Sequence, residues 1–315
     1  MTNYNPSQAP VLFLIFKRFD TTLAVIKQIR KAKPRKLYIA ADGPRNEILG
    51  EREECTRLRE TVLNLVDWDC ELKTLFREKN LTAKVAISEA IHWFFEHEES
   101  GIILEDDCVP HLTFFSFCSQ LLEKYSEDSR VMHISGSNLL NGKTYGDGSY
   151  FFSRHVNIWG WATWRRAWKY YDLQMSTFQK FEAQNQIYNI MQVMYKRYHK
   201  RLKRVYENAN TSTNEWDYPW TYTVFAQGGL SITPNQNLIS NIGFGDNAGT
   251  TLDPNNPIAN LPTLAIEEVK HPTFMLPFRE ADEKFIKITA GRPSIRQQLR
   301  VFLYKQRKVF QRQKE

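Results

Sequence analysis

The sequence predicts an α/β fold with a mainly parallel central sheet flanked by helices. Short apolar runs such as residues 11–16 (VLFLIF) lack polar alternation, which indicates strands that are buried on both faces. These runs alternate with segments of helical length, and such alternation builds parallel strand–helix–strand units. The 315 residues are 42% hydrophobic, so the chain can form one large domain with a substantial core.

Up to residue 135 the pattern predicts strands joined by helices. We expect strands at 11–16, 36–41, 70–77, 101–104 and 131–135, and helices at 20–29, 47–65, 81–96 and 111–125. Asp20 or Thr21 is a helix cap, and Asp42-Gly43-Pro44 is a strong turn signal after the second strand. Ligands of such sheets bind beyond the carboxyl ends of the strands, so polar residues there are candidate site residues.

The second half of the chain differs in composition. Four tryptophans lie in 151–171, and we expect basic helical structure at 178–208, a helix at 215–227, a short strand pair at 231–242 and a loop at 241–258. We assign one domain to residues 1–290, with a first half at 10–135 and a second half at 136–290. A basic amphipathic C-terminal helix is expected at 291–315.

The formal net charge of +7 is concentrated in the C-terminal tail. Residues 292–315 hold eight bases and one acid, a surplus equal to the whole net charge, so the body is near neutral. This distribution argues against a nucleic-acid partner. The tail at 293–314 places apolar residues at near-helical spacing among the bases. It is either a helix that lies on an anionic membrane surface or one that packs on its own domain or a partner.

The four cysteines form no C-x-x-C pair, so we expect free thiols rather than a disulfide framework or a zinc site. The first ten residues do not resemble a signal peptide, and no apolar run approaches the ~20 residues that span a bilayer. We expect a cytoplasmic protein, peripheral on the inner face of the membrane if the tail binds there.

The strongest candidate for chemistry is the acidic triplet Glu105-Asp106-Asp107, which directly follows an apolar strand. Three adjacent carboxylates repel one another and are costly to desolvate, and a divalent cation relieves that cost. Magnesium and manganese prefer oxygen ligands and commonly bridge protein carboxylates and a diphosphate. In extended backbone Glu105 and Asp107 point one way and Asp106 the other. The alternative is a solvated turn that happens to be acidic.

Four motifs support the interpretation of the triplet as a functional site: ILEDDC-x-P, GWATWRRAW, WDYPW and NLISNIGFG. With them, residues 10–250 resemble GT-A fold glycosyltransferases with a Rossmann-like sheet, in particular the N-acetylglucosaminyltransferase I type and the bacterial hemolytic-protein-like relatives. The resemblance implies an inverting enzyme that uses a UDP-sugar donor with Mn²⁺ or Mg²⁺. It implies a glycan or lipid-linked acceptor and a role in cell-surface polysaccharide synthesis, with 10–135 binding the nucleotide-sugar and 136–290 the acceptor.

The resemblance also implies roles for single residues. On the donor side Asp107 would bind the metal, Asp106 the ribose, Glu105 the donor sugar, Arg18 the diphosphate and Asp42 the uracil. Arg77, at the end of the third strand, joins this donor-binding set. Asp217, directly after Trp216, would be the catalytic base that takes the proton of the acceptor hydroxyl.

Each assignment has a structural alternative. Arg18 can be a surface arginine, Asp42 a turn cap, and Asp217 an acid favoured at a helix start. Trp159, Trp161 and Trp216 are candidates for a sugar platform, but such rings also pack in cores, which is the reading we favour for Trp164 and Trp168. A lone histidine is more often structural, so His271 stays outside the metal set.

Two other functions compete with glycosyl transfer. A sugar nucleotidyltransferase usually has a glycine-rich phosphate loop after the first strand, and Phe16-Lys17-Arg18-Phe19 contains no glycine. A non-catalytic glycan- or membrane-binding protein could keep the fold, but the acidic triplet together with a candidate base argues against it.

Overall fold

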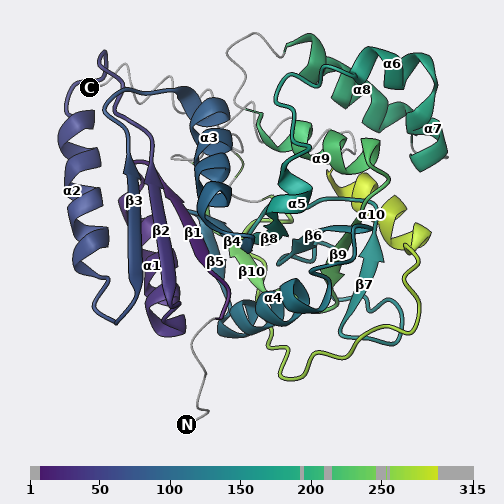
Figure 1. Ribbon diagram of the computed structural model, residues 1–315, viewed down its shortest axis with the longest axis horizontal. Helices are drawn as coiled ribbons and strands as arrows, with labels where there is room; N and C mark the ends of the chain where they lie inside the picture. The colour runs from purple at the N-terminus through teal and green to yellow at the C-terminus, as the bar shows by residue number, and fades with distance from the viewer. Residues whose placement is uncertain (1–7, 192–194, 209–214, 246–252, 254–255, 290–315) are drawn as a thin grey trace.

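The computed structural model describes residues 8–191, 195–208, 215–245, 253 and 256–289. The predicted tail helix at 291–315 and half of the predicted loop at 241–258 lie outside these residues. Eight strands form one sheet in the order β3-β2-β1-β4-β8-β6-β9-β7 (Figure 1). This single sheet joins strands from both predicted halves of the chain.

The first half follows the predicted alternation closely. Its strands are β1(Val11–Ile15), β2(Lys36–Ala41), β3(Glu71–Phe76) and β4(Ser100–Glu105), with β5(Cys108–Pro110) after the triplet and β6(Val131–Ser135) beyond it. Its helices are α1(Phe19–Ala32), α2(Glu51–Asn64), α3(Thr82–His97) and α4(Leu112–Lys124). β1 is buried along its whole length, as its unbroken apolar sequence predicts.

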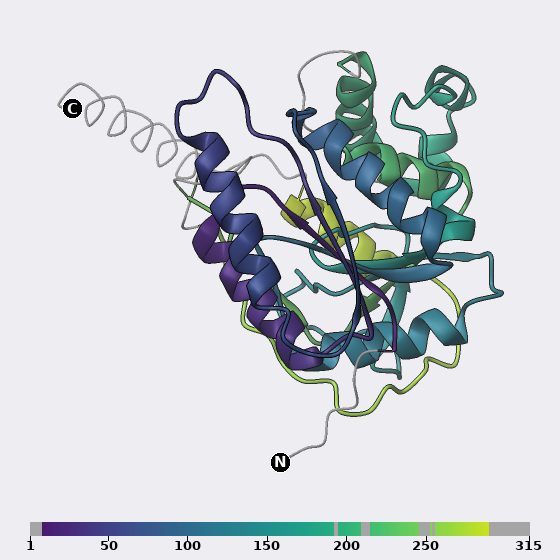
Figure 2. The same ribbon diagram turned by 60° about the vertical axis from the view of Figure 1, so that its left-hand side comes forward.

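Alternate residues of β1 face different helical layers. Val11, Phe13 and Ile15 pack in a core with α1, α2 and α4, whereas Leu12 and Leu14 pack in a second core with α3. Figure 2 shows α1 and α2 along one face of the sheet and α3 across from them. The sheet therefore lies between two layers of helices, with its strand ends open to ligands.

The sheet is mixed, which corrects the prediction of a mainly parallel one. β3, β2, β1 and β4 are parallel, but β8(Trp161–Trp164) runs antiparallel to both β4 and β6, and β7(Tyr150–Ser153) antiparallel to β9(Leu230–Pro234). Parallel neighbours need a crossover, usually a helix, and none separates β6, β7 and β8. Helices lie between β8 and β9 in the chain, and β9 pairs parallel with β6.

The predicted strand pair at 231–242 forms two strands that do not pair with each other. β9 joins the main sheet between β6 and β7, while β10(Ile239–Asn241) pairs antiparallel with β5. Between them Asn235 donates from Nδ2 to the carbonyls of Tyr145 and Gly148, at 3.0 and 2.9 Å. These bonds hold the chain as it leaves one sheet for the other.

The second half supplies further helices. α5(Arg165–Trp168) follows β8, and the predicted basic helical segment forms α6(Phe178–Ala183), α7(Gln186–Met191) and α8(Tyr195–Glu207). α9(Asp217–Ala226) matches the predicted helix, and α10(Arg279–Thr289) was not expected from the sequence. Among the described residues no helix is long and apolar enough to span a bilayer. All four cysteines are free, as predicted.

A buried histidine fixes α9 against the sheet. His133 on β6 has no exposed surface, and its ring stacks on Trp161 with centroids 5.1 Å apart. Trp220 Nε1 of α9 donates to His133 Nδ1 at 3.2 Å, so His133 Nε2 carries the proton and donates to the Asn157 carbonyl at 3.0 Å. Burial lowers the pKa of His133 to about 3, so the ring is neutral and suits both bonds.

We predict that Gly101→Ala destabilises the fold. An added Cβ would lie 2.3 Å from Phe94 Cζ and 2.9 Å from the Pro10 carbonyl oxygen, and Phe94 is fully buried and cannot move aside. Urea unfolding should show a loss of about 1–3 kcal/mol, as for other overpacked cores. Ser100→Ala, one residue earlier and only partly buried, is the control. Equal stability of the two variants would contradict this packing.

Candidate active site

The acidic triplet and Arg18 meet where the order of the parallel strands reverses. β2 and β3 follow β1 on one side, whereas β4 lies on the other, with Leu14 opposite Glu105. Open α/β sheets bind ligands at this switch point, beyond the carboxyl ends of the strands. The fold therefore places the triplet at the position where a ligand site is expected.

Arg18 bridges two of the three acids. Its Nε donates to Asp106 Oδ2 at 3.2 Å and its Nη2 to Asp106 Oδ1, while its Nη1 donates to Asp107 Oδ2 at 2.8 Å. The Arg18 side chain is 23% exposed and those of Asp106 and Asp107 are 6% and 14% exposed. Arg18 is thus part of the acidic site and not a free surface arginine.

The electrostatics of this cluster are strongly perturbed. Burial acts to lower the pKa of Arg18, but the charges of Asp106 and Asp107 outweigh it and raise the pKa, so the guanidinium stays charged. Burial raises the pKa of Asp106 to about 6 even though Arg18 opposes the shift. Burial and the charges of Asp107 and Asp106 raise the pKa of Glu105 well above its usual value. One guanidinium therefore does not neutralise the three carboxylates.

The two-stranded sheet of β5 and β10 places the segment around Gly243 against Asp107. Because β10 pairs with β5, the Ile242 amide donates to the Asp107 carbonyl at 2.9 Å. A Cβ on Gly243 would lie 1.9 Å from Asp107 Oδ2, so no larger residue fits beside this carboxylate. Phe244 then packs edge-on against Trp159 at 5.7 Å. The sequence contains both motifs, but nothing in it reveals that Gly243 touches the triplet.

Asp217 is the first residue of α9, and Pro219 follows two residues later. Pro219 falls in the first turn, where backbone N–H groups have no partner within the helix. Burial raises the pKa of Asp217 to about 6, and the positive charge of Arg201 partly opposes this. The charge of Asp217 contributes to the raised pKa of Glu105, so the two carboxylates interact electrostatically. The Tyr171 hydroxyl donates to the Trp216 carbonyl at 3.0 Å and holds the start of α9 in place.

Asp42 and Arg77 are engaged elsewhere. Asp42 accepts hydrogen bonds from the Gly43 and Leu81 amides at 2.9 Å and from Asn80 Nδ2 at 3.0 Å, which is the turn-capping alternative. Arg77 pairs with Glu89 on α3 at 3.1 Å. Neither side chain is bonded to the triplet among the described residues, and their donor-binding roles stay predictions.

The three candidate platform tryptophans differ in burial. Trp161 has no exposed surface, and its ring stacks between His133 and Trp216 in the core. Trp216 is 4% exposed and also belongs to this core. Trp159 is only partly buried, so of the three it is the ring with a face to offer a sugar. Trp164 and Trp168 lie in the core, as favoured from the sequence.

Within the described residues no three His, Cys, Asp or Glu side chains are grouped to hold a metal ion by themselves. His271 is hydrogen-bonded through Nδ1 to the Tyr150 hydroxyl at 3.0 Å, on strand β7. Magnesium sites that also use substrate phosphates need only one or two protein carboxylates. The triplet fits a cation of that kind, with Asp107 as a ligand, better than a permanently bound metal.

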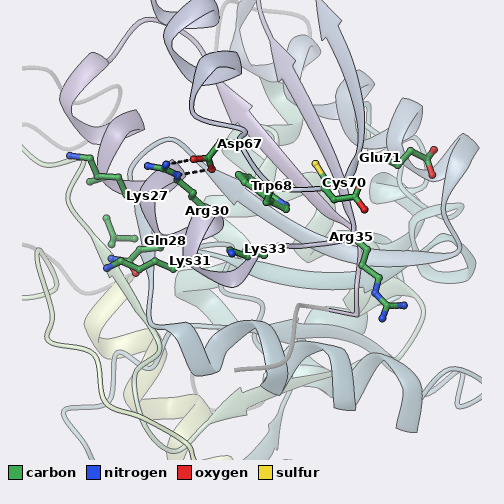
Figure 3. A pocket seen from close by; sticks show the side chains of 13 residues that line it. Lys27, Gln28, Arg30, Lys31, Lys33, Arg35, Asp67, Trp68, Cys70 and Glu71 are labelled. Atoms are coloured by element: carbon green, nitrogen blue, oxygen red, sulfur yellow. Dashed lines mark hydrogen bonds and ion pairs between the residues drawn. The ribbon is translucent and has the colours of Figure 1, made fainter. Parts of the chain in front are cut away.

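A wide cavity of about 1340 Å³ lies elsewhere, around the C-terminal end of α1 and the start of β3 (Figure 3). Lys27, Lys31, Lys33 and Arg35 line it, together with Arg30, which pairs with Asp67. Cations at a helix C-terminus are favoured by the helix dipole, which accounts for part of this clustering. The cavity lies mainly around the C-terminal end of α1, and Val109 of β5 also lines it.

No protein-family model and no curated protein matches the chain. Among solved structures, the glycosyltransferase GlyE of Streptococcus pneumoniae TIGR4 is similar, with 12% identity and a TM-score of 0.34. The likeness covers 72% of this chain and 45% of that one, so the chain spans less than half the length of GlyE. A likeness at this identity and TM-score is no evidence for a shared activity. What the chain itself displays is an α/β fold with an acidic site at its switch point.

We predict that Arg18→Gln lowers the free energy of unfolding by about 3 kcal/mol at pH 8, because it leaves partly buried carboxylates without a cation. The deficit should shrink at pH 5, since the raised pKa of Asp106 lets it take up a proton as the pH falls. Urea unfolding at the two pH values measures both effects. Arg30→Gln breaks the exposed pair with Asp67 and should change stability little. A pH-independent deficit would contradict the charge argument.

Proposed function

We propose that this chain is a metal-dependent, inverting glycosyltransferase of the GT-A fold. It would move a hexosyl or N-acetylhexosaminyl group from a UDP-sugar to a glycan or lipid-linked acceptor. The supporting observation is the arrangement of three acids and Arg18 at the switch point, with the separate carboxylate of Asp217 interacting with Glu105. The strand order β3-β2-β1-β4, continued by antiparallel β8, is compatible with this fold.

On the donor side Arg18 would bind two partners in succession, first the acids of the triplet and then the donor diphosphate. Without donor it is held by Asp106 and Asp107. A diphosphate offers the guanidinium the same paired oxygens as a carboxylate, so Arg18 can exchange one for the other. A bound Mn²⁺ or Mg²⁺ would supply Lewis-acid stabilisation of the leaving diphosphate, with Asp107 as its protein ligand. Asp106 would then be released to accept hydrogen bonds from the ribose hydroxyls, while Glu105 would accept them from the donor sugar.

On the acceptor side Asp217 is the general base. As the acceptor oxygen forms its bond to the anomeric carbon, the bond from that carbon to the phosphate oxygen breaks and UDP leaves. The hydroxyl proton passes to Asp217, whose pKa of about 6 leaves it mostly ionised at neutral pH. Attack on the face opposite the leaving group inverts the configuration. Trp159, next to the triplet through Phe244, is the ring placed to contact a sugar.

The competing functions receive less support. A nucleotidyltransferase would need a phosphate-binding loop after β1, but α1 begins directly there, with the Thr22 amide donating to the Arg18 carbonyl at 3.1 Å. A binding module would not need a buried carboxylate with a raised pKa at the start of α9. A role in polysaccharide synthesis at the cytoplasmic face of a membrane, aided by the tail at 293–314, is part of the proposal and rests on the sequence.

Metal dependence is tested with Asp107→Asn. In calorimetry the wild-type protein should bind UDP at least about tenfold more tightly with Mn²⁺ than without it, because the metal bridges carboxylate and diphosphate. Asp107→Asn should lose this gain, while Asp69→Asn, an exposed acid remote from the triplet, should keep it. Equal UDP binding by the wild type with and without Mn²⁺ would favour the non-catalytic binding module.

The base is tested with Asp217→Asn and a pH profile. Transfer, measured as UDP release in the presence of acceptor, should fall about 10²–10⁴-fold in the variant, while UDP binding is unchanged. The wild-type rate should rise with pH through about 6 and then level off, because the base acts only when ionised above its pKa. A wild-type transfer rate in the variant would exclude Asp217 as the base.

A further inference from the structure

Helix α8 lays a basic surface over the helix that carries Asp217. Tyr198, Leu202 and Val205 of α8 are buried and belong to one core cluster with Tyr222 and Phe225 of α9. The remaining described positions of α8 are rich in cations, namely Lys196, Lys200, Arg201, Lys203 and Arg204. The apolar face therefore fixes where these cations lie relative to the candidate base.

Two of these cations are neutralised within the protein. Lys203 pairs with Glu182 at 2.9 Å, and Arg204 pairs with Glu215 at 2.7 Å. Arg201 forms no ion pair in the part of the chain that the structure describes. Unlike the exposed Lys196 and Lys200, it is only partly exposed.

Arg201 is held beside Asp217 by an aromatic ring. Its guanidinium lies over the Tyr218 ring, 4.7 Å from the centroid, and Tyr218 directly follows Asp217. The Arg201 Nε atom is buried and has no hydrogen-bond partner among the described residues. A buried donor without an acceptor is costly. Because Arg201 as a whole is only partly buried, the rest of its guanidinium can meet an anionic ligand.

We propose that Arg201 binds an anionic group of the acceptor, so that the acceptor substrate is a glycan that carries a phosphate or carboxylate close to the hydroxyl that is glycosylated. This inference rests on the proposed function of Asp217. Either anion offers paired oxygens that match a guanidinium. The donor diphosphate is the less suitable partner, because Arg18, which directly precedes α1, would bind it, whereas α8 packs on α7 and α9.

The pairing would also adjust the base. The positive charge of Arg201 favours the ionised form of Asp217 before the acceptor binds. An anion on Arg201 cancels that field, so the affinity of Asp217 for a proton rises once the acceptor is in place. Binding of such an acceptor would therefore raise the proton affinity of Asp217 when transfer takes place.

The test is calorimetric titration of the full chain, with UDP and Mn²⁺ present to fill the donor side, using glucose 6-phosphate, glucuronate and glucose as probes. At least one of the two anionic sugars should bind about ten- to a hundredfold more tightly than glucose, as expected for charge-assisted hydrogen bonds. Arg201→Gln should abolish this preference and Arg201→Lys should retain part of it. Lys196→Gln removes an equal charge from an exposed position of the same helix and should leave the preference intact.

The outcomes separate this inference from the proposed function. A preference for one anionic sugar names the group that Arg201 binds, whether phosphate or carboxylate. No preference over glucose in the wild type, or an equal loss in Arg201→Gln and Lys196→Gln, would overturn the anionic-acceptor inference. Binding of UDP itself, measured first in the same samples, tests the donor side independently. Thermal unfolding of each variant verifies that a lost preference does not come from a lost fold.

Discussion

The ion pairs of Arg18 with Asp106 and Asp107 are the constraint on which the site depends. Three adjacent acids at the end of a buried strand would repel one another, and the guanidinium makes them compatible with folding. Arg18 reaches them only because β1 and β4 are parallel neighbours in a fixed register. The tight packing of Gly243 on Asp107 restricts the same carboxylate further. The core of the sheet therefore sets the geometry of the charges.

A second set of contacts holds the candidate base. His133, kept neutral by burial, connects β6 to Trp220 of α9 and stacks on Trp161 of β8. These three aromatic residues come from segments far apart in the sequence and converge beneath the start of α9. The aromatic richness of the second half thus serves mainly to fix a helix. Fixing that helix is what places Asp217 within electrostatic reach of Glu105.

How much the sequence predicts depends on whether the signal is local. β1, β2 and β6 are found within a residue because each is a short, mostly apolar run, and the triplet and Arg18 stand out because they follow such strands. β8 is missed because the short run WATW, flanked by further tryptophans, has no strand periodicity of its own and gains its place only by pairing with β4 and β6. The contact of Gly243 with Asp107 and the burial of Trp161 also depend on distant segments, so no local pattern predicts them.

The two sides of the site differ in the charged groups that surround their acids. On the donor side three carboxylates face one arginine, which leaves a negative excess that suits a donor arriving with a divalent cation. At the start of α9 the neighbours of Asp217 include cations, with Arg201 over the Tyr218 ring and Arg204 paired with Glu215. A site with this distribution of charges can select its two substrates by their charge as well as by hydrogen bonds to their hydroxyl groups. In the proposed reaction the metal ion would be held at Asp107, because a metal ion beside Asp217 would hold that carboxylate ionised and weaken it as a proton acceptor.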